Sequence, residues 1–113
     1  METKHTVAAL AAIAQESRLH IFRLLVQAGQ SGLPAGKVSE LTNIPPSSLS
    51  FHLKELTHAN MVTSRQEGRF VIYSANFETM NALIAFLTEN CCAGVPCTPD
   101  NPVCTTTEVN TSI

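Results

Sequence analysis

The chain lacks most of the features that identify membrane proteins and enzymes. No apolar run approaches the roughly 20 residues that a helix needs to cross a bilayer. The apolar stretch near the N-terminus continues into another helical pattern without a convincing cleavage context, which disfavours a signal peptide. A Ser/His/Asp set, a glycine-rich phosphate loop, paired carboxylates and a Cys-x-x-Cys motif are all missing. We therefore expect a cytoplasmic protein without enzymatic activity, whose 113 residues suffice for one domain with a modest core.

Basic residues and cysteines occupy opposite ends of the chain. All seven Lys and Arg residues lie in residues 1–73, together with five acidic residues. Residues 74–113 contain four acidic residues, no basic residue and all four cysteines. The net charge of −2 therefore hides an N-terminal part with a small excess of positive charge. That excess is compatible with nucleic-acid binding, which the net charge alone would disfavour.

The stretch IPPSSLSFHLKELTHANMV, residues 44–62, predicts a short helix with one apolar side. Pro45 and Pro46 suit a first helical turn, and Asn60 suits the left-handed conformation of a helix end. The apolar side consists of Leu49, Leu53 and Leu56. The opposite side carries Ser47, Ser50, Phe51, Lys54 and His58. Small hydroxyls, a lysine and an aromatic ring facing outward are typical of a helix that reads a DNA groove, although an ordinary surface helix is the alternative.

Three further helical patterns precede this stretch. Residues 6–14, 16–28 and 34–42 show helical spacing, with Gly29 and Asn43 as stops after the second and third. The side chains expected on the apolar sides are Val7, Leu10, Ala11 and Ala14, then Leu19, Phe22, Leu25 and Val26, then Val38 and Leu41. Because only a few residues join the last two helices, and the second presents polar residues, they form a predicted helix-turn-helix.

From residue 61 the apolar pattern changes to that of strands. Residues 62–65 and 69–73 are rich in β-branched and aromatic residues, and residues 66–68 provide a glycine for the turn of a hairpin. Arg65 and Arg69 flank the expected tip, where they can reach a phosphate or the minor groove or simply be solvated. A hairpin directly after a DNA-reading helix is a wing, so the fold class is mainly α with a β-hairpin wing.

A last helical pattern covers residues 77–90. Its expected inward residues are Phe77, Met80, Leu83, Ile84 and Leu87, with Phe86 beside them. Since the helix-turn-helix already has its own core, the first and last helices offer apolar surface to a partner. We expect a homodimer, with folding back onto the same subunit as the alternative.

The chemistry of the chain is concentrated in its four cysteines. Cys91, Cys92, Cys97 and Cys104 follow the last helix within fourteen residues, a density that core cysteines do not show. Thiolates of Cys91, Cys92 and Cys97 would suit a soft ion such as trivalent arsenic or antimony. Cys104 is a spare. A four-thiol zinc site is a less favoured alternative, because structural zinc prefers thiols two to four residues apart.

About residues 15–75 resemble the winged helix-turn-helix of the ArsR/SmtB family of metal-sensing repressors. The matching segments are ESRLHIFRLL, VSELTNIPPSSLSFHLKELTHANMV and SRQEGRFVIYS. The resemblance implies that Ser47, Ser48, Ser50 and His52, with Arg65 and Arg69 of the wing, contact double-stranded operator DNA. To these we add Phe51 and Lys54, which face outward on the helical wheel, whereas His52 lies nearer the leucines. The family usually has Gly where this chain has Asn60.

The same resemblance points to the arsenic-responsive members with a vicinal cysteine pair and a third cysteine after the last helix. It implies a homodimer, residues 1–90, that binds DNA and releases it when arsenite or antimonite binds the segment 91–113. No permanent cofactor is expected. A thiol-based redox repressor of the same fold is the alternative, and it needs only two of the cysteines.

Overall fold

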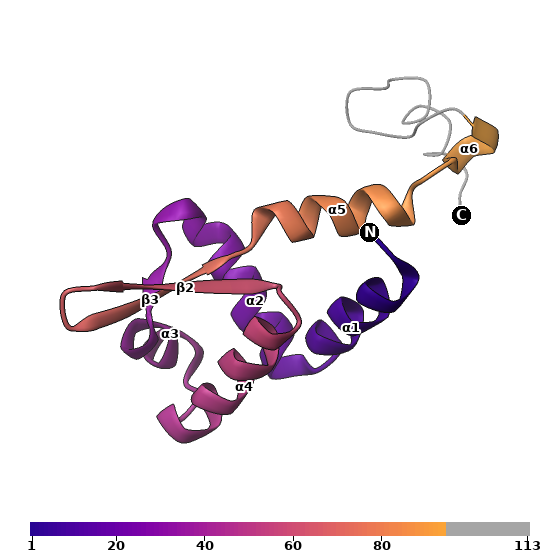
Figure 1. Cartoon of the computed structure of the whole chain (residues 1–113). Coiled ribbons are helices and arrows are strands. Elements are labelled where there is room, and N and C mark those ends of the chain that lie inside the picture. Colours follow the sequence, from indigo (N-terminus) through magenta and orange to yellow (C-terminus); the bar gives the residue numbers. More distant parts are fainter. Residues whose placement is uncertain (95–113) are drawn as a thin grey trace, which may run out of the picture. The chain divides into compact units, whose positions relative to one another are not determined.

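The computed structural model describes residues 1–94 (Figure 1). The predicted thiol ligand Cys97 and the spare Cys104 lie outside the described residues. Residues 1–83 form one compact unit, and the chain from Ile84 onward is described separately. The described elements are α1 (Thr3–Ile13), α2 (Glu16–Ala28), the 3₁₀ turn η1 (Gly29–Ser31), β1 (Leu33–Pro34), α3 (Ala35–Thr42), α4 (Pro46–His58), β2 (Val62–Glu67), β3 (Phe70–Ala75), α5 (Phe77–Leu87) and α6 (Cys91–Gly94).

The predicted helix-turn-helix and its preceding helix are confirmed. Helix α2 has the predicted bounds, and Gly29 ends it at φ 76°. Helix α3 ends at Asn43 in the left-handed conformation, with φ 60°. Pro46 occupies the first position of α4, where its missing N–H leaves no hydrogen bond unmade. Asn60, just past α4, has the predicted positive φ of 64°.

The core of residues 1–83 lies where α2, α3 and α4 meet the sheet. Its largest fully buried side chains are Ile21, Leu25, Val38, Leu56, Met61 and Val62. The expected burial of Leu19 and Leu41 is wrong, since these side chains are 43% and 49% exposed. On α2 the buried side chains are the expected Phe22 and Leu25 together with Ile21, which replaces the expected Leu19.

Helix α1 packs through its small residues, not through its larger ones. It begins at Thr3, three residues before the predicted start, and buries Thr6, Ala9 and Ala12 against the rest of the unit. The Thr6 hydroxyl donates to the Glu2 carbonyl at 3.0 Å, which satisfies this buried polar group. The side predicted to be apolar is instead exposed, with Val7 at 59% and Leu10 at 38%. The small side chains allow α1 to approach the rest of the unit closely, and the larger side chains of Val7 and Leu10 remain exposed.

The sheet has the strand order β1-β3-β2, with both pairs antiparallel. Since Glu67 pairs with Phe70, the hairpin turn consists of Gly68 and Arg69 alone, and the predicted turn at residues 66–68 is wrong. Gly68 has φ 63°, as a tight two-residue turn requires. Strand β1 has only two residues and was not predicted, because so short a segment shows no alternation of polar and apolar side chains.

Helix α5 ends earlier than the sequence pattern predicts. It stops at Leu87 rather than at residue 90, and Asn90 has a left-handed φ of 59°. Leu83 is buried as predicted, but Ile84 and Leu87 are 52% and 59% exposed, so their predicted inward position is wrong for the single chain. None of the helices within residues 1–94 is both long and apolar enough to span a membrane.

Candidate nucleic-acid interface

Side-chain hydrogen bonds fix the turn between α3 and α4. The Ser39 hydroxyl donates to the Ile44 carbonyl at 2.6 Å. The Thr42 hydroxyl donates to the Val38 carbonyl at 2.7 Å and accepts from the Ile44 amide at 3.3 Å. Together with the left-handed Asn43, these bonds set the direction in which α4 leaves the turn.

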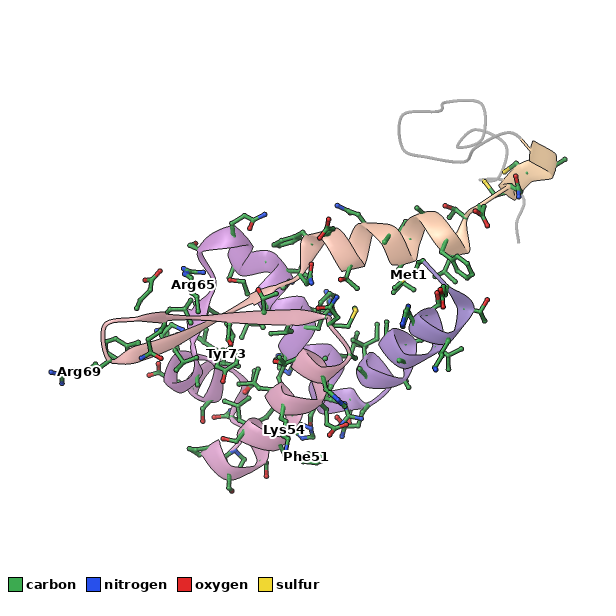
Figure 2. All side chains as sticks on the ribbon, viewed as in Figure 1. Met1, Phe51, Lys54, Arg65, Arg69 and Tyr73 are labelled. Carbon is green, nitrogen blue, oxygen red and sulfur yellow. The ribbon has the colours of Figure 1, made fainter. Side chains whose placement is uncertain are left out.

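Helix α4 presents the predicted two sides. Leu49, Leu53 and Leu56 are at most 3% exposed and anchor the helix to the core. The predicted DNA-contacting residues other than His52 are exposed on this helix: Ser47, Ser48, Ser50, Phe51 and Lys54. In Figure 2 Phe51 and Lys54 project from the same side of α4. Phe51 is 56% exposed, so its ring is accessible on the outer side of α4.

His52 lies between the two sides of α4 and is half-buried. Its Nδ1 atom is 3.4 Å from Nη1 of Arg18 in α2. Its ring meets the ring of Phe51 edge-on, with the centroids 5.7 Å apart and an interplanar angle of 62°. His52 is therefore tied both to the supporting helix and to the exposed aromatic residue.

A groove of about 450 Å³ separates α4 from the wing. The polar residues that line it are Ser50, Lys54, Glu55, Thr57, His58, Ser64 and Tyr73. Sequence reasoning missed the contributions of Ser64 and Tyr73. They face each other across β2 and β3, so a correct turn of two residues would have placed them on one face of the hairpin. Hydroxyl groups beside a lysine are well suited to the phosphate oxygens of a DNA backbone.

The two wing arginines have different surroundings. Arg69 lies in the turn itself, and Figure 2 shows its side chain extending away from the hairpin. Within residues 1–94 it makes no hydrogen bond or ion pair. Arg65 lies inside β2 and donates to Glu67 Oε2 at 2.6 Å and to the Ser31 carbonyl at 2.7 Å. It also donates to Ser74 Oγ at 3.3 Å and to the Gln30 carbonyl at 3.5 Å.

These contacts mean that Arg65 fastens the wing to the turn η1. The buried Ser74 hydroxyl adds a bond to the same Gln30 carbonyl at 3.3 Å. A guanidinium group has five N–H donors, so Arg65 keeps little capacity for DNA in this arrangement. Arg69 keeps all of its donors. The DNA contact of either arginine stays a prediction.

The cysteine pair directly follows the turn at the end of α5. Cys91 is half-buried and Cys92 is exposed. The Cys91 amide donates to the Thr88 carbonyl at 3.0 Å, and Cys92 has a left-handed φ of 55°. Residues 1–94 contain no group of three His, Cys, Asp or Glu side chains able to hold a metal. The three-thiol site thus stays a prediction, since its third member is outside the described residues.

Two helices joined by a fixed turn, the second exposing polar side chains, and a hairpin directly behind them define a winged helix-turn-helix protein. Residues 13–65 match the model of a helix-turn-helix domain family. The arsenical resistance operon repressor of Bacillus subtilis (strain 168) is 35% identical over 81 residues, which cover 72% of this chain and 73% of that protein. The chain therefore belongs to the ArsR family of transcriptional regulators, as the sequence resemblance predicted.

Solved structures show the same fold. An ArsR-like transcriptional regulator from Rhodococcus sp. RHA1 aligns with a TM-score of 0.67 at 23% identity, over 74% of this chain and 76% of that one. The homodimeric winged helix-turn-helix domain of Mb0332 from Mycobacterium bovis aligns with a TM-score of 0.62 at 22% identity, over 77% of this chain and 81% of that one. The named relatives are regulators of transcription, not enzymes.

Proposed function

We propose that this chain is a homodimeric repressor that leaves its operator when trivalent arsenic or antimony binds its C-terminal thiolates. The observation that carries the proposal is the vicinal pair Cys91 and Cys92 at the start of α6, in a chain whose relative is named an arsenical resistance operon repressor. Residues 1–90 would bind DNA and form the dimer, and residues 91–113 would bind the metalloid. A repressor of this kind acts in the cytoplasm, where the DNA and reduced thiols are.

The DNA contacts would come from α4 and the wing. The exposed residues Ser47, Ser48, Ser50, Phe51 and Lys54 would enter the major groove, with Phe51 suited to a thymine methyl group. His52 would add a contact from the inner edge of this surface. Arg69, at the wing tip, would reach a phosphate or the minor groove, whereas Arg65 would have to exchange some of its present hydrogen bonds for a DNA contact.

The homodimer is supported by apolar surface that the single chain does not cover. The exposed apolar side chains are Val7 and Leu10 on α1, Met1 just before it, and Ile84 and Leu87 on the last part of α5. A solved structure of the same fold is described as homodimeric. A twofold dimer would place its two α4 helices in successive major grooves, about 34–36 Å apart, on a palindromic operator.

The inducer would be held by sulfur. Arsenite is uncharged near neutral pH, so it can reach thiols without electrostatic attraction. Three thiols of Cys91, Cys92 and Cys97 would replace its hydroxyl groups and release water, leaving arsenic with its preferred pyramidal set of soft ligands. Of the two adjacent thiols, Cys92 is exposed and Cys91 is half-buried. A methylated arsenical, which has fewer exchangeable positions, would need only the pair.

Arsenic binding can release DNA only if the ligand prefers a dimer geometry that DNA does not. Drawing Cys97 back to the end of α5 would change the last helix and with it the dimer interface. A coupling free energy of about 1–3 kcal/mol would lower operator affinity about 5–150-fold. No permanent cofactor is part of this mechanism.

The proposal can be tested with a fluorescent duplex that wild-type protein selects from a random library. Fluorescence anisotropy measures its binding while arsenite is added, for wild type and for single Ser replacements of each cysteine. We expect C91S, C92S and C97S to stay bound, while C104S is released like wild type. Release that is lost in C104S alone would refute the proposed third ligand. Release by peroxide, reversed by a thiol reductant, would instead support the redox alternative.

A further inference from the structure

We infer that Arg18 is a positioning residue for DNA binding, which fixes the tautomer of His52 so that its Nε2–H faces the DNA. Arg18 lies in the first turn of α2, far from the exposed side of α4 in the sequence. Its Nε donates to the Ala12 carbonyl at 2.6 Å, and its backbone N–H donates to Gln15 Oε1 at 2.9 Å. The Nε bond holds the guanidinium near the end of α1, and the backbone bond caps the first turn of α2.

The chemistry of the two side chains determines which one donates. A guanidinium group has only N–H donors, so in its 3.4 Å contact with His52 it cannot accept. The Nδ1 atom of His52 must therefore accept, and an imidazole nitrogen accepts only when it carries no hydrogen. The ring hydrogen is then on Nε2, across the ring from Arg18. At 3.4 Å the contact is at the long end for a hydrogen bond, so the hydrogen on Nε2 is what we infer from pairing this donor with Nδ1, and the tautomer is the quantity to measure.

This arrangement gives the half-buried His52 a defined role. With Nδ1 engaged by Arg18, the ring offers Nε2–H as its one strong donor, which suits a phosphate oxygen or a guanine acceptor. The same bond holds the ring in the plane that meets Phe51 edge-on at 5.7 Å. Arg18 would thus order two residues of the DNA-reading surface while contacting neither DNA nor inducer. The DNA part of this inference rests on the proposed function, but the tautomer does not.

The tautomer can be measured on the free protein without DNA or arsenic. Long-range ¹H–¹⁵N spectra at a pH where His52 is neutral distinguish a bare ring nitrogen from a protonated one. We expect wild-type His52 to show a bare Nδ1 and a protonated Nε2. Arg18→Met should produce a mixture of tautomers, whereas Arg23→Met, on the same helix, should leave His52 unchanged. A wild-type His52 with its hydrogen on Nδ1 would overturn the inference, whether or not the Arg18 variant folds.

The consequence for DNA is measured on the duplex selected by wild-type protein. His52→Gln is the informative partner variant, because its amide N–H occupies the position of Nε2 but offers nothing at the position of Nδ1. We expect Arg18→Met to weaken binding about twofold in the wild-type background, because a mixture of tautomers leaves about half of the molecules with the hydrogen on Nε2. It should have no further effect in the His52→Gln background.

The two experiments separate the possible failures. If Arg18→Met weakens binding equally in both backgrounds, Arg18 acts through general stability and the inference is wrong. If wild-type protein selects no duplex at all, the proposed function fails, while the tautomer of the free protein still decides the role of Arg18.

Discussion

The two wing arginines provide a sharp test, because Arg65 is hydrogen-bonded within the fold whereas Arg69 extends from the turn. Arg65→Met keeps the aliphatic stem but removes the bonds to Glu67, Ser31, Ser74 and Gln30. The ion pair with Glu67 is exposed, with 42% and 56% of the two side chains accessible, so it adds less than about 1 kcal/mol. The bonds to Ser31 and to the buried Ser74 add about 0.5–1 kcal/mol each.

We therefore expect Arg65→Met to lower the free energy of unfolding by about 1–2 kcal/mol. Arg69→Met, the matched control in the turn, should stay within about 0.5 kcal/mol of wild type. Urea unfolding followed by far-ultraviolet circular dichroism measures both, since the chain has no tryptophan to report by fluorescence. The two midpoints should differ while the slopes stay equal.

Loss of DNA affinity should be larger for Arg69→Met than for Arg65→Met, the reverse of the order for stability. Arg69→Met should weaken binding to all duplexes and reduce the slope of log affinity against log salt by about one, as the loss of a phosphate contact does. An Arg65 variant as stable as wild type would refute the assignment of Arg65 to fastening the wing. The salt slope of Arg65→Met, measured in parallel, decides whether Arg65 also contacts phosphate as the family resemblance implies.

Four further variants test the fold and the dimer. Gly32→Ala should destabilise the fold by at least about 2 kcal/mol, because Gly32 has φ 68° and an added Cβ would meet the Tyr73 carbonyl oxygen. Gly36→Ala, in open space on α3, should stabilise the fold by about 0.5–1 kcal/mol. Thermal unfolding compares the two variants. Asn60→Ala should lower the free energy of unfolding in urea by about 1–2 kcal/mol, since it places alanine at φ 64° and removes the hydrogen bonds to Thr79 and Asn76. An unchanged urea midpoint would show that these bonds contribute nothing to stability. Val7→Asp should convert the dimer to a folded monomer in sedimentation equilibrium, and an undisturbed dimer would remove α1 from the interface.

The parts of the fold that local signals determine could be predicted from the sequence. Gly29 and Pro46 mark helix boundaries through backbone geometry that few other residues supply, so α2 and α4 were located correctly. The three leucines of α4 are buried because no other side of that helix is apolar. On α2, by contrast, Leu19 and Ile21 compete for the core, and the helical wheel alone cannot decide between them.

The features that escaped prediction depend on contacts between distant segments. Strand β1 exists only because β3 pairs with it, and the groove residue Tyr73 is placed by the register of the hairpin. The bond between Arg18 and His52 joins residues 34 positions apart, for which a single sequence offers no signal. The hydrogen bonds by which Arg65 fastens the wing could not be predicted for the same reason, because the acceptors Gln30 and Ser31 are distant in the sequence.

In the proposed mechanism, soft thiolates after α5 control the affinity of the dimer for DNA. A variant with all four cysteines replaced by serine, to which arsenite is added in its complex with the selected duplex, isolates the contribution of these thiolates. We expect this variant to bind the duplex as tightly as wild type and to stay bound at arsenite concentrations that release wild type completely. Release of the cysteine-free variant at the same concentrations would contradict the proposed mechanism.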